Sequence, residues 1–235
     1  MRKFPVLLGS IICLLAACSG SNQSQLTEQE KKEGWISLFD GASTKGWHLY
    51  NKGKAPSAWS VDSGQLICKT DPSLEHDDLL TDSEYENYDL KFDWMISRGG
   101  NSGVFINVVE RKDLATAWRS GPEYQLLDSA NVDYAILKKR SGCLYGFQNQ
   151  LNPVDANPPG QWNHSEIKQQ NGKVEFYLNG ILTAKEDFTS QAWKDTVSRT
   201  YFKDIPVFGK ATKGYIALQD WHKEVAFRNI RIKQL

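Results

Sequence analysis

The chain has 235 residues, and its 28 Lys and Arg residues balance its 28 Asp and Glu residues, so the formal net charge is zero. It carries no basic block and no stripe that interleaves basic with aromatic residues, which argues against a nucleic-acid partner. The N-terminal apolar stretch, "FPVLLGSIICLLAA", is too short to span a membrane as a helix.

The first predicted element is a lipoprotein signal peptide over residues 1–17. Two basic residues precede the apolar stretch, which ends in "LLAAC" with small residues just before Cys18. We expect cleavage before Cys18 and acylation of its thiol, which would anchor the protein in a bilayer because two or more acyl chains bind stably. An ordinary secretory signal with a chance cysteine is the alternative.

Residues 18–33 are predicted to form a flexible tether between the lipid and the domain. They are polar and contain one aliphatic residue, Leu26, so they offer little to pack. No acidic residue follows Cys18 directly, which favours the periplasmic face of the outer membrane as the location in the cell envelope. Residues 34–235 remain, about 200 in all, a length that fits one large β domain as well as two small ones.

Downstream of the tether the chain is predicted to form many short strands. Residues 88–97, "YDLKFDWMIS", alternate apolar and polar side chains as a half-buried strand does. Asn179-Gly180 predicts a hairpin within 173–186, and Asp62-Ser63-Gly64 predicts another. Further strands are predicted at 103–110, 122–128, 214–220 and 225–235, with short helical turns within 111–120 and 189–204.

Short strands separated by Gly and Asn turns are typical of an antiparallel sandwich or barrel. At this length we expect an all-β fold, a two-sheet antiparallel jelly-roll sandwich of the concanavalin A-like lectin and glucanase type. The eight tryptophans are many for this length. Most are expected in the core, and a few on an open sheet face, where aromatic rings stack on sugar rings. No oligomeric state is indicated.

Cys68 and Cys143 are the cysteines that remain after the signal peptide is removed and Cys18 is acylated. In an oxidising envelope they could form one disulfide, and two buried free thiols are an equal alternative. The sequence has neither a CxxC motif nor a Cys–His cluster, which argues against a zinc site with thiolate ligands.

The stretch "GPEYQLLD", residues 121–128, predicts a carboxylate and an amide side by side on one sheet face. If Tyr124 and Leu126 point into the core, Glu123 and Gln125 point together to the opposite face. Such a face suits the recognition of hydroxyl groups, and Glu123 could act as a general base or acid, or as a metal ligand. A plain solvated polar face is the alternative. Asp128 is expected where the strand ends.

Asn101, in "GGNSGVF", is predicted at the rim of the sheet, because glycines allow positive φ and close approach of a ligand. A hairpin turn in which Asn101 serves only the backbone is the alternative. None of the four histidines has HExxH spacing, and His164 shares a strand face with Glu166. GxSxG and an ExDxxE-like strand are also absent, so neither a serine-hydrolase elbow nor a two-carboxylate glycosidase is supported.

Eight motifs in one order carry a resemblance that covers residues 35–235. They are "WISLFDGASTKGW", "DLLTDSEYENYDLKFDW", "GGNSGVF", "GPEYQLLD", "LYG", "WNHSEI", "FYLNG" and "IALQDWHKEVAFRNIRIKQL". The chain resembles the 3-keto-disaccharide hydrolase domain family, which is common in saccharolytic envelope bacteria, often as lipoproteins. The resemblance implies a concanavalin-like jelly roll that acts on glycosides already oxidised to a ketone at carbon 3.

Such a ketone acidifies the proton on C2, so a base can remove it, the aglycone leaves C1 by elimination, and water adds afterwards. The resemblance implies Glu123 and His164 as the acid–base or metal-binding pair. It also implies that Asn101, Gln125 and Tyr145 position the sugar. A divalent metal could be the electrophile for the C3 oxygen.

The chain departs from the family pattern at two places. Many members read "QDH" where this chain reads "QDWH", so Trp221 stands at that histidine's position and His222 follows. Either His222 takes the role through a loop, or Trp221 forms a sugar platform. "NGKVEFYLNG" also lacks two histidines common in the family. The main alternative function is a non-catalytic carbohydrate-binding lipoprotein, and a weaker one is a conventional endo-glucanase.

Overall fold

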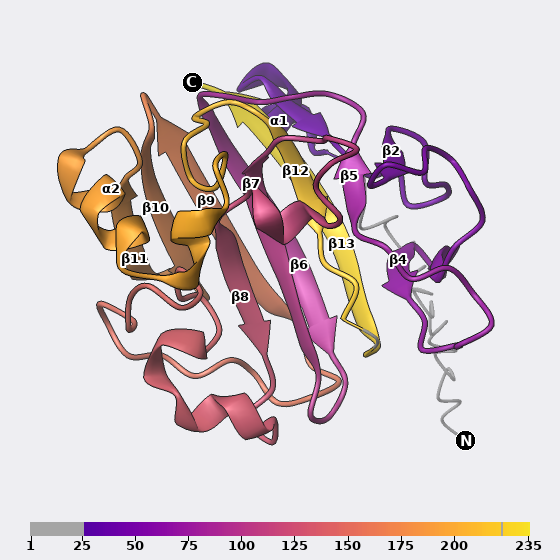
Figure 1. Cartoon of the computed structure of the whole chain (residues 1–235). Helices are drawn as coiled ribbons and strands as arrows, with labels where there is room; N and C mark the ends of the chain where they lie inside the picture. The colour runs from indigo at the N-terminus through magenta and orange to yellow at the C-terminus, as the bar shows by residue number, and fades with distance from the viewer. Residues whose placement is uncertain (1–25, 222) are drawn as a thin grey trace, which may run out of the picture.

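Two antiparallel sheets lie face to face in the computed structural model, which describes residues 26–221 and 223–235 (Figure 1). The expected all-β two-sheet sandwich is therefore confirmed. The five-stranded sheet has the spatial order β2 (Trp47–Leu49), β5 (Leu79–Thr81), β12 (Tyr215–Leu218), β7 (Asn101–Val108) and β8 (Glu123–Leu127).

The eight-stranded sheet forms the other layer of the sandwich. Its main path runs β11 (Ile181–Asp187), β10 (Lys173–Leu178), β9 (Asn163–Gln170), β6 (Tyr88–Ile96), β13 (Val225–Gln234), β4 (Gln65–Cys68) and β3 (Trp59–Asp62). The eighth strand, β1 (Trp35–Ser37), pairs with β13 away from this path.

Both predicted hairpins form with the turn chemistry that the sequence indicates. Asn179 and Gly180 take φ values of 49° and 82° between β10 and β11, and Ser63 and Gly64 take 50° and 77° between β3 and β4. Positive φ at both central residues matches the right-handed twist of the paired strands, which is why Asn-Gly and similar pairs occur there.

Helices are few and short, as expected. The predicted turns correspond to η1 (Ala117–Arg119), α2 (Gln191–Ser198) and η4 (Tyr201–Asp204), and the others are α1 (Glu28–Lys32), η2 (Val132–Ala135) and η3 (Leu137–Lys139). Within the described ranges, no helix has the length and apolar character needed to cross a bilayer.

Part of the predicted tether, α1, is helical. The Thr27 hydroxyl accepts a hydrogen bond from the Glu30 N–H, and the Glu30 carboxylate accepts one from the Thr27 N–H, which forms a capping box. Glu30 also pairs with Arg231 of β13 at 3.1 Å. Local capping and this ion pair order the segment without apolar burial. Cys18 and the signal peptide lie outside the described residues.

The core lies between the sheets and fixes which way β8 faces. The Tyr124 ring meets Phe92 and Phe176 of the opposite sheet edge to face, at 5.7 and 5.1 Å. Its hydroxyl shares a 2.7 Å hydrogen bond with Ser165 of β9. Burial of such a phenylalanine contributes roughly 1.5–3 kcal/mol. Because Tyr124 points inward, Glu123 and Gln125 on either side of it must point out of the sandwich.

The outer face of the five-stranded sheet is covered by loops. Phe105 and Ala217 on this face pack against Leu114 and Ala117 from the segment after β7. A second covering segment, residues 188–214, returns from β11 to β12 and carries α2 and η4 (Figure 1). These loops leave part of the face open, and the candidate site lies there.

Cys68 and Cys143 are both buried and free. The two-thiol alternative therefore holds, and the disulfide does not form.

Candidate functional site

A pocket of about 170 Å³ opens on the outer face of the five-stranded sheet. We call it the sheet pocket, and define it by a floor of polar side chains from the strands and a wall of aromatic side chains, mainly from the covering loops. The floor is formed by Asn101, Glu123, Gln125 and Gln219, with Gly121 beside them, and the wall by Phe105, Trp118, Tyr145, Phe147, Tyr201, Phe202, Phe208 and Trp221.

Strand register brings the floor residues together. Gly103 of β7 stands opposite Gln125 of β8, and the Gln219 N–H after β12 donates to the Gly103 carbonyl at 2.9 Å. The Gln125 amide donates to the Asn101 side-chain oxygen at 2.8 Å. Asn101 therefore orients a neighbour in the pocket and does not serve only the backbone, while its role in positioning the sugar stays a prediction.

The Glu123 side chain crosses diagonally over β7 and lies on Gly103. A Cβ atom at Gly103 would lie 2.1 Å from Glu123 Oε1, far inside any real contact. The backbone of Gly103 is ordinary extended strand, so the glycine is required here by close approach and not by φ. Gly103 thus makes room for the carboxylate at the bottom of the pocket.

Glu123 lies in an environment that disfavours its charge. Burial, with a further contribution from the negative charge of Asp78, raises the pKa of Glu123 well above the ordinary carboxyl range, and Lys139 opposes only part of this. Among the described residues, none hydrogen-bonds to its carboxylate. A desolvated carboxyl with a raised pKa suits general acid–base chemistry near neutral pH.

Two amide oxygens on the floor lack partners among the residues that the structure describes. Gln125 Oε1 and Gln219 Oε1 are buried, and neither has a hydrogen-bond partner in the described part of the chain. Buried polar atoms are nearly always satisfied in native proteins, so these two oxygens suit ligand hydroxyl groups as donors. Gln125 lies on β8 and Gln219 directly follows β12, the two strands on either side of β7. The two oxygens therefore flank Gly103 and the Glu123 carboxylate that lies over it.

The aromatic wall rests on a stack of rings. Phe202 stacks on Phe208 with ring centroids 3.7 Å apart, and Tyr201 stacks on Phe202 at 4.1 Å. Tyr201 is 62% exposed and Trp221 is 52% exposed at the mouth of the pocket. The wall offers flat apolar faces and few hydrogen-bonding groups, which suits stacking on a sugar ring or on the group attached to it.

Tyr145 is placed in the sheet pocket by its backbone. Its N–H donates to the Glu123 carbonyl at 3.0 Å, so the two residues are held side by side. The Lys139 ammonium lies 5.5 Å from the centre of the Tyr145 ring and pairs with Asp133 at 3.0 Å. Trp221 also lines the pocket, and its role as a sugar platform stays a prediction. His222 lies outside the described residues.

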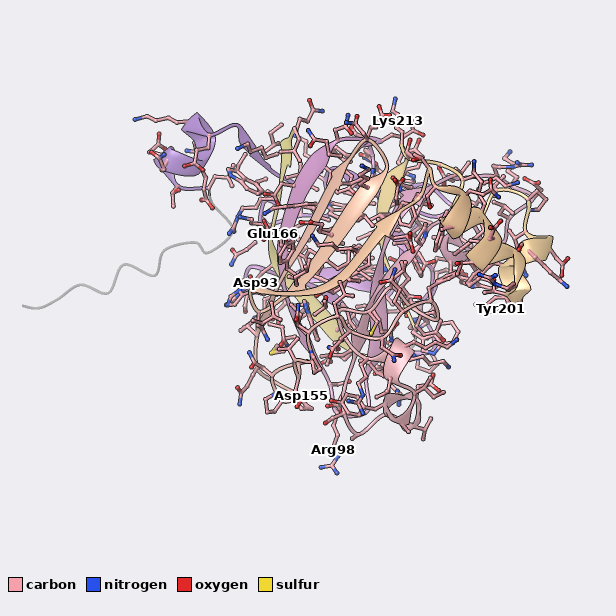
Figure 2. The ribbon with its side chains drawn as sticks, turned by 90° about the vertical axis from the view of Figure 1, so that its left-hand side faces the viewer. Asp93, Arg98, Asp155, Glu166, Tyr201 and Lys213 are labelled. Carbon is pink, nitrogen blue, oxygen red and sulfur yellow. The ribbon has the colours of Figure 1, made fainter. Side chains whose placement is uncertain are left out.

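His164 is not part of the sheet pocket, and the predicted Glu123–His164 pair does not form. Tyr124 and Ser165 meet inside the core, so Glu123 and His164, each one residue earlier, face outward from opposite sheets. Figure 2 shows Tyr201, at the pocket mouth, and Asp93 on opposite sides of the sandwich. The Asp93 carboxylate is hydrogen-bonded to His164 Nδ1 at 2.6 Å.

Asp93 lies on the face of β6 that was expected to be polar and half-exposed, but it is buried. The carboxylate is buried and also accepts hydrogen bonds from the side chains of Arg228 and Asn229. These partners come from the neighbouring strand β13. His164 itself is exposed and serves as a cap on this network.

Residues 34–233 match the model of the 3-keto-alpha-glucoside-1,2-lyase-like domain. The chain belongs to this family. It is 31% identical over 230 residues to a 3-keto-disaccharide hydrolase of Bacteroides thetaiotaomicron, covering 86% of this chain and 79% of that protein. A candidate glycosyl hydrolase of known structure from Parabacteroides distasonis is 32% identical, with 90% of this chain and 99% of that chain covered and a TM-score of 0.82.

More distant structures share only the architecture with this family member. A Bacillus subtilis protein of unknown function with a galectin-like fold is 13% identical, with 90% of this chain and 94% of that chain covered and a TM-score of 0.50. This likeness shows the fold alone. The motif residues that the family resemblance placed in a site, Asn101, Glu123, Gln125 and Tyr145, all line the sheet pocket, whereas His164 does not.

Several residues of this family member's site escaped the sequence analysis. Gln219 follows from alternation with Ala217 in "IALQD", but the aromatic wall comes from loops with no periodic signal. Asp78 was also missed. Burial, with the charges of Asp220 and Asp77, raises the pKa of Asp78 to about 7 against the opposing backbone N–H groups of Asp220 and Ala117.

Asp78 lies in a second, smaller cavity of about 130 Å³, which we call the adjoining cavity. It shares Trp118, Gln219 and Trp221 with the sheet pocket. Within the described residues, one group of side chains could hold a metal ion, namely Cys68, His76 and Asp220. Two of these, His76 and Asp220, line the adjoining cavity, and Glu123 is not among them.

Proposed function

We propose that this protein is a hydrolytic enzyme that cleaves 3-keto-glycosides, either 3-keto-disaccharides or 3-keto-glucosides. Family membership and the 31% identical 3-keto-disaccharide hydrolase support the substrate class. The observation that carries the proposal is the Glu123 carboxylate, which lies over Gly103 at the bottom of the sheet pocket with unpartnered amide oxygens on both sides.

In this mechanism Glu123 is the general base. It takes the proton from C2, and the electrons of the broken C–H bond form an enolate with the C3 ketone. The enolate expels the aglycone oxygen from C1, which leaves a C1–C2 double bond conjugated with the ketone. The proton on Glu123 passes to the leaving oxygen. Water then adds, with its hydroxyl on C1 and its proton on C2, to give the free 3-keto sugar.

The surroundings of Glu123 support this role. A carboxylate shielded from water is a stronger base than a solvated one, because its charged form is less stabilised. Gln125 and Gln219 would accept hydrogen bonds from sugar hydroxyl groups and so hold C2 near the base. Trp221 and Tyr201 would stack on the sugar or on its aglycone at the pocket mouth.

The test compares oxidised substrates with their parents. The mature protein is incubated with 3-keto-lactose, 3-keto-trehalose and a 3-keto aryl glucoside, each beside the unoxidised compound. Turnover of the keto compounds alone, with solvent deuterium incorporated at C2, is the expected result. Glu123→Gln should abolish turnover and retain binding.

Other outcomes would overturn the proposal. Equal turnover of the unoxidised parents would indicate conventional glycoside hydrolysis. Glycan binding without turnover of any compound would instead favour the non-catalytic carbohydrate-binding lipoprotein.

We also propose that the enzyme is lipid-anchored in the cell envelope through Cys18, at the periplasmic face of the outer membrane. Support comes from the signal pattern alone, "LLAAC" followed by "SGSNQ". Metabolic labelling with a palmitate analogue should label the wild-type protein, and Cys18→Ala should lose the label and leave the membrane fraction. Labelling that survives Cys18→Ala would contradict the anchor.

A further inference from the structure

Three potential metal ligands from distant segments meet beside the sheet pocket. Cys68 ends β4, His76 lies in the loop between β4 and β5, and Asp220 follows β12. One ligand atom from each lies within 4.8 Å of the others. His76 Nδ1 is 2.7 Å from Asp220 Oδ2, although the two residues are 144 positions apart in the chain.

The three side chains are shielded from solvent. Cys68 is fully buried, the Asp220 side chain is 0% exposed and the His76 side chain 9% exposed. A thiol, an imidazole and a carboxylate are costly to bury together without partners. They need either a closed network of hydrogen bonds or an ion at their centre.

The orientation of His76 favours an ion. Its Nε2 donates a hydrogen bond to the Asp71 carbonyl at 2.8 Å, which directs Nδ1 toward Asp220 and Cys68. The 2.7 Å contact between Nδ1 and Asp220 Oδ2 holds a second proton, and this is the proton that an ion would displace. Histidines that bind metals almost always donate their other N–H to a backbone carbonyl or a carboxylate in this way. Asp71 thus provides the outer partner that a metal-bound His76 needs.

The adjoining cavity lies beside two of the three ligands. His76 and Asp220 line the adjoining cavity, which also contacts Gln219 and Trp221 of the sheet pocket. Zinc sites that keep an open position use three protein ligands with a water or substrate as the fourth. The cavity of about 130 Å³ has room for that fourth ligand.

We propose that Cys68, His76 and Asp220 bind one Zn²⁺ ion whose fourth position opens to the adjoining cavity. Sulfur, nitrogen and oxygen ligands together suit zinc, whereas Mg²⁺ and Ca²⁺ prefer oxygen ligands alone. Zinc bonds of about 2.0–2.3 Å place tetrahedral ligand atoms roughly 3.3–3.8 Å apart. The His76 and Asp220 side chains therefore separate slightly as the ion replaces the proton between them. Such an ion supplies Lewis-acid chemistry.

This site does not depend on the proposed activity, so its test measures binding. The purified mature protein is dialysed against a chelator and then against Zn²⁺, and its metal content is determined. We expect one zinc per chain, with a rise in the melting temperature of roughly 5–10 °C at a hundredfold excess over Kd. Mg²⁺ should give neither effect. Co²⁺ should give a thiolate charge-transfer band in the near ultraviolet.

Two variants and a matched control assign the ligands. Cys68→Ser and His76→Ala should weaken zinc binding at least roughly 10-fold, and Cys68→Ser should remove the cobalt–thiolate band. Cys143→Ser is the control, since Cys143 is also buried and free but does not belong to the cluster. Wild-type protein that retains no stoichiometric zinc and shows no thermal shift would overturn the proposal. A cobalt–thiolate band that persists in Cys68→Ser and disappears in Cys143→Ser would do so too.

Discussion

Gly103→Ala is the substitution that most directly tests the geometry of Glu123. The new methyl group would lie 2.1 Å from Glu123 Oε1, and the carboxylate must move by about 1.3 Å to restore an ordinary contact of 3.4 Å. A displacement of about 1 Å at a reacting group can lower the rate roughly 100-fold. We therefore expect kcat/KM on a 3-keto-glycoside to fall about 100-fold.

The fold should survive this change. Gly103 lies in a strand interior with ordinary backbone angles, where alanine is favoured by roughly 0.5–1 kcal/mol over glycine. This gain offsets part of the strain of moving one side chain, so the melting temperature should stay within a few degrees of wild type. Steady-state kinetics and thermal unfolding followed by circular dichroism measure the two effects separately.

A double-mutant cycle decides whether Gly103 acts through Glu123. The cycle is read out by the melting temperature, because Glu123→Ala leaves no turnover to compare. In the Glu123→Ala background the methyl group meets no carboxylate, so Gly103→Ala should cost no stability there. Equal effects on the melting temperature in both backgrounds would mean that Gly103→Ala strains the strand and not Glu123. Wild-type activity in Gly103→Ala would refute the placement of the base.

Three further predictions concern the charge of Glu123, the ring of Trp221 and the position of His164. Because burial raises the pKa of Glu123, the folded protein binds the carboxyl proton more tightly than the unfolded chain does. The stability that this proton contributes is fully present below pH 4.5, the ordinary pKa, and is lost as pH rises through the folded pKa. Glu123→Gln should therefore have a higher melting temperature than wild type at neutral pH, and the same melting temperature as wild type at about pH 4. A lower melting temperature of the variant at neutral pH would contradict the burial of the carboxylate. Trp221→Ala should raise KM for an aryl 3-keto-glucoside roughly 10-fold with little change in kcat, if its exposed ring stacks on substrate; an unchanged KM in steady-state assays counts against stacking. His164→Ala should leave kcat/KM within about twofold, because His164 lies on the opposite face, and a large loss would restore it to the site.

The polar floor could be predicted because successive side chains of a strand point to opposite faces of the sheet. Once Tyr124 and Leu126 were assigned to the core, Glu123 and Gln125 had to share the other face, and the structure places them together in the sheet pocket. The same rule placed His164 and Ser165 on opposite faces of β9, but it could not say which sheet β9 joins. Without that information, His164 and Glu123 are predicted as partners, although in the structure they face away from each other.

The parts of the site that could not be predicted come from long-range contacts. Tyr201, Phe202 and Phe208 of the aromatic wall depend on how residues 188–214 fold back over the five-stranded sheet, and no periodic pattern in a loop predicts such a wall. The sequence shows neither a CxxC motif nor a Cys–His cluster, so it does not predict that Cys68 and His76 meet. Asp220 joins them only through sheet topology, since β12 returns beside β5 after the chain has built most of the sandwich.

The number of carboxylates in the sheet pocket bears on the reaction. Glu123 is the one carboxylate among the described residues that line the pocket, whereas conventional glycosidases need two, about 5–9.5 Å apart across the sugar. Asp78 does not supply the second, because it lies in the adjoining cavity and its two oxygens accept N–H groups from Asp220 and Ala117. Elimination from a 3-keto sugar needs one base beside C2, since the negative charge left by the C2 proton passes to the ketone oxygen and no oxocarbenium-like positive charge has to be stabilised by a second carboxylate. A site with a single desolvated carboxylate is therefore consistent with elimination and argues against the endo-glucanase alternative.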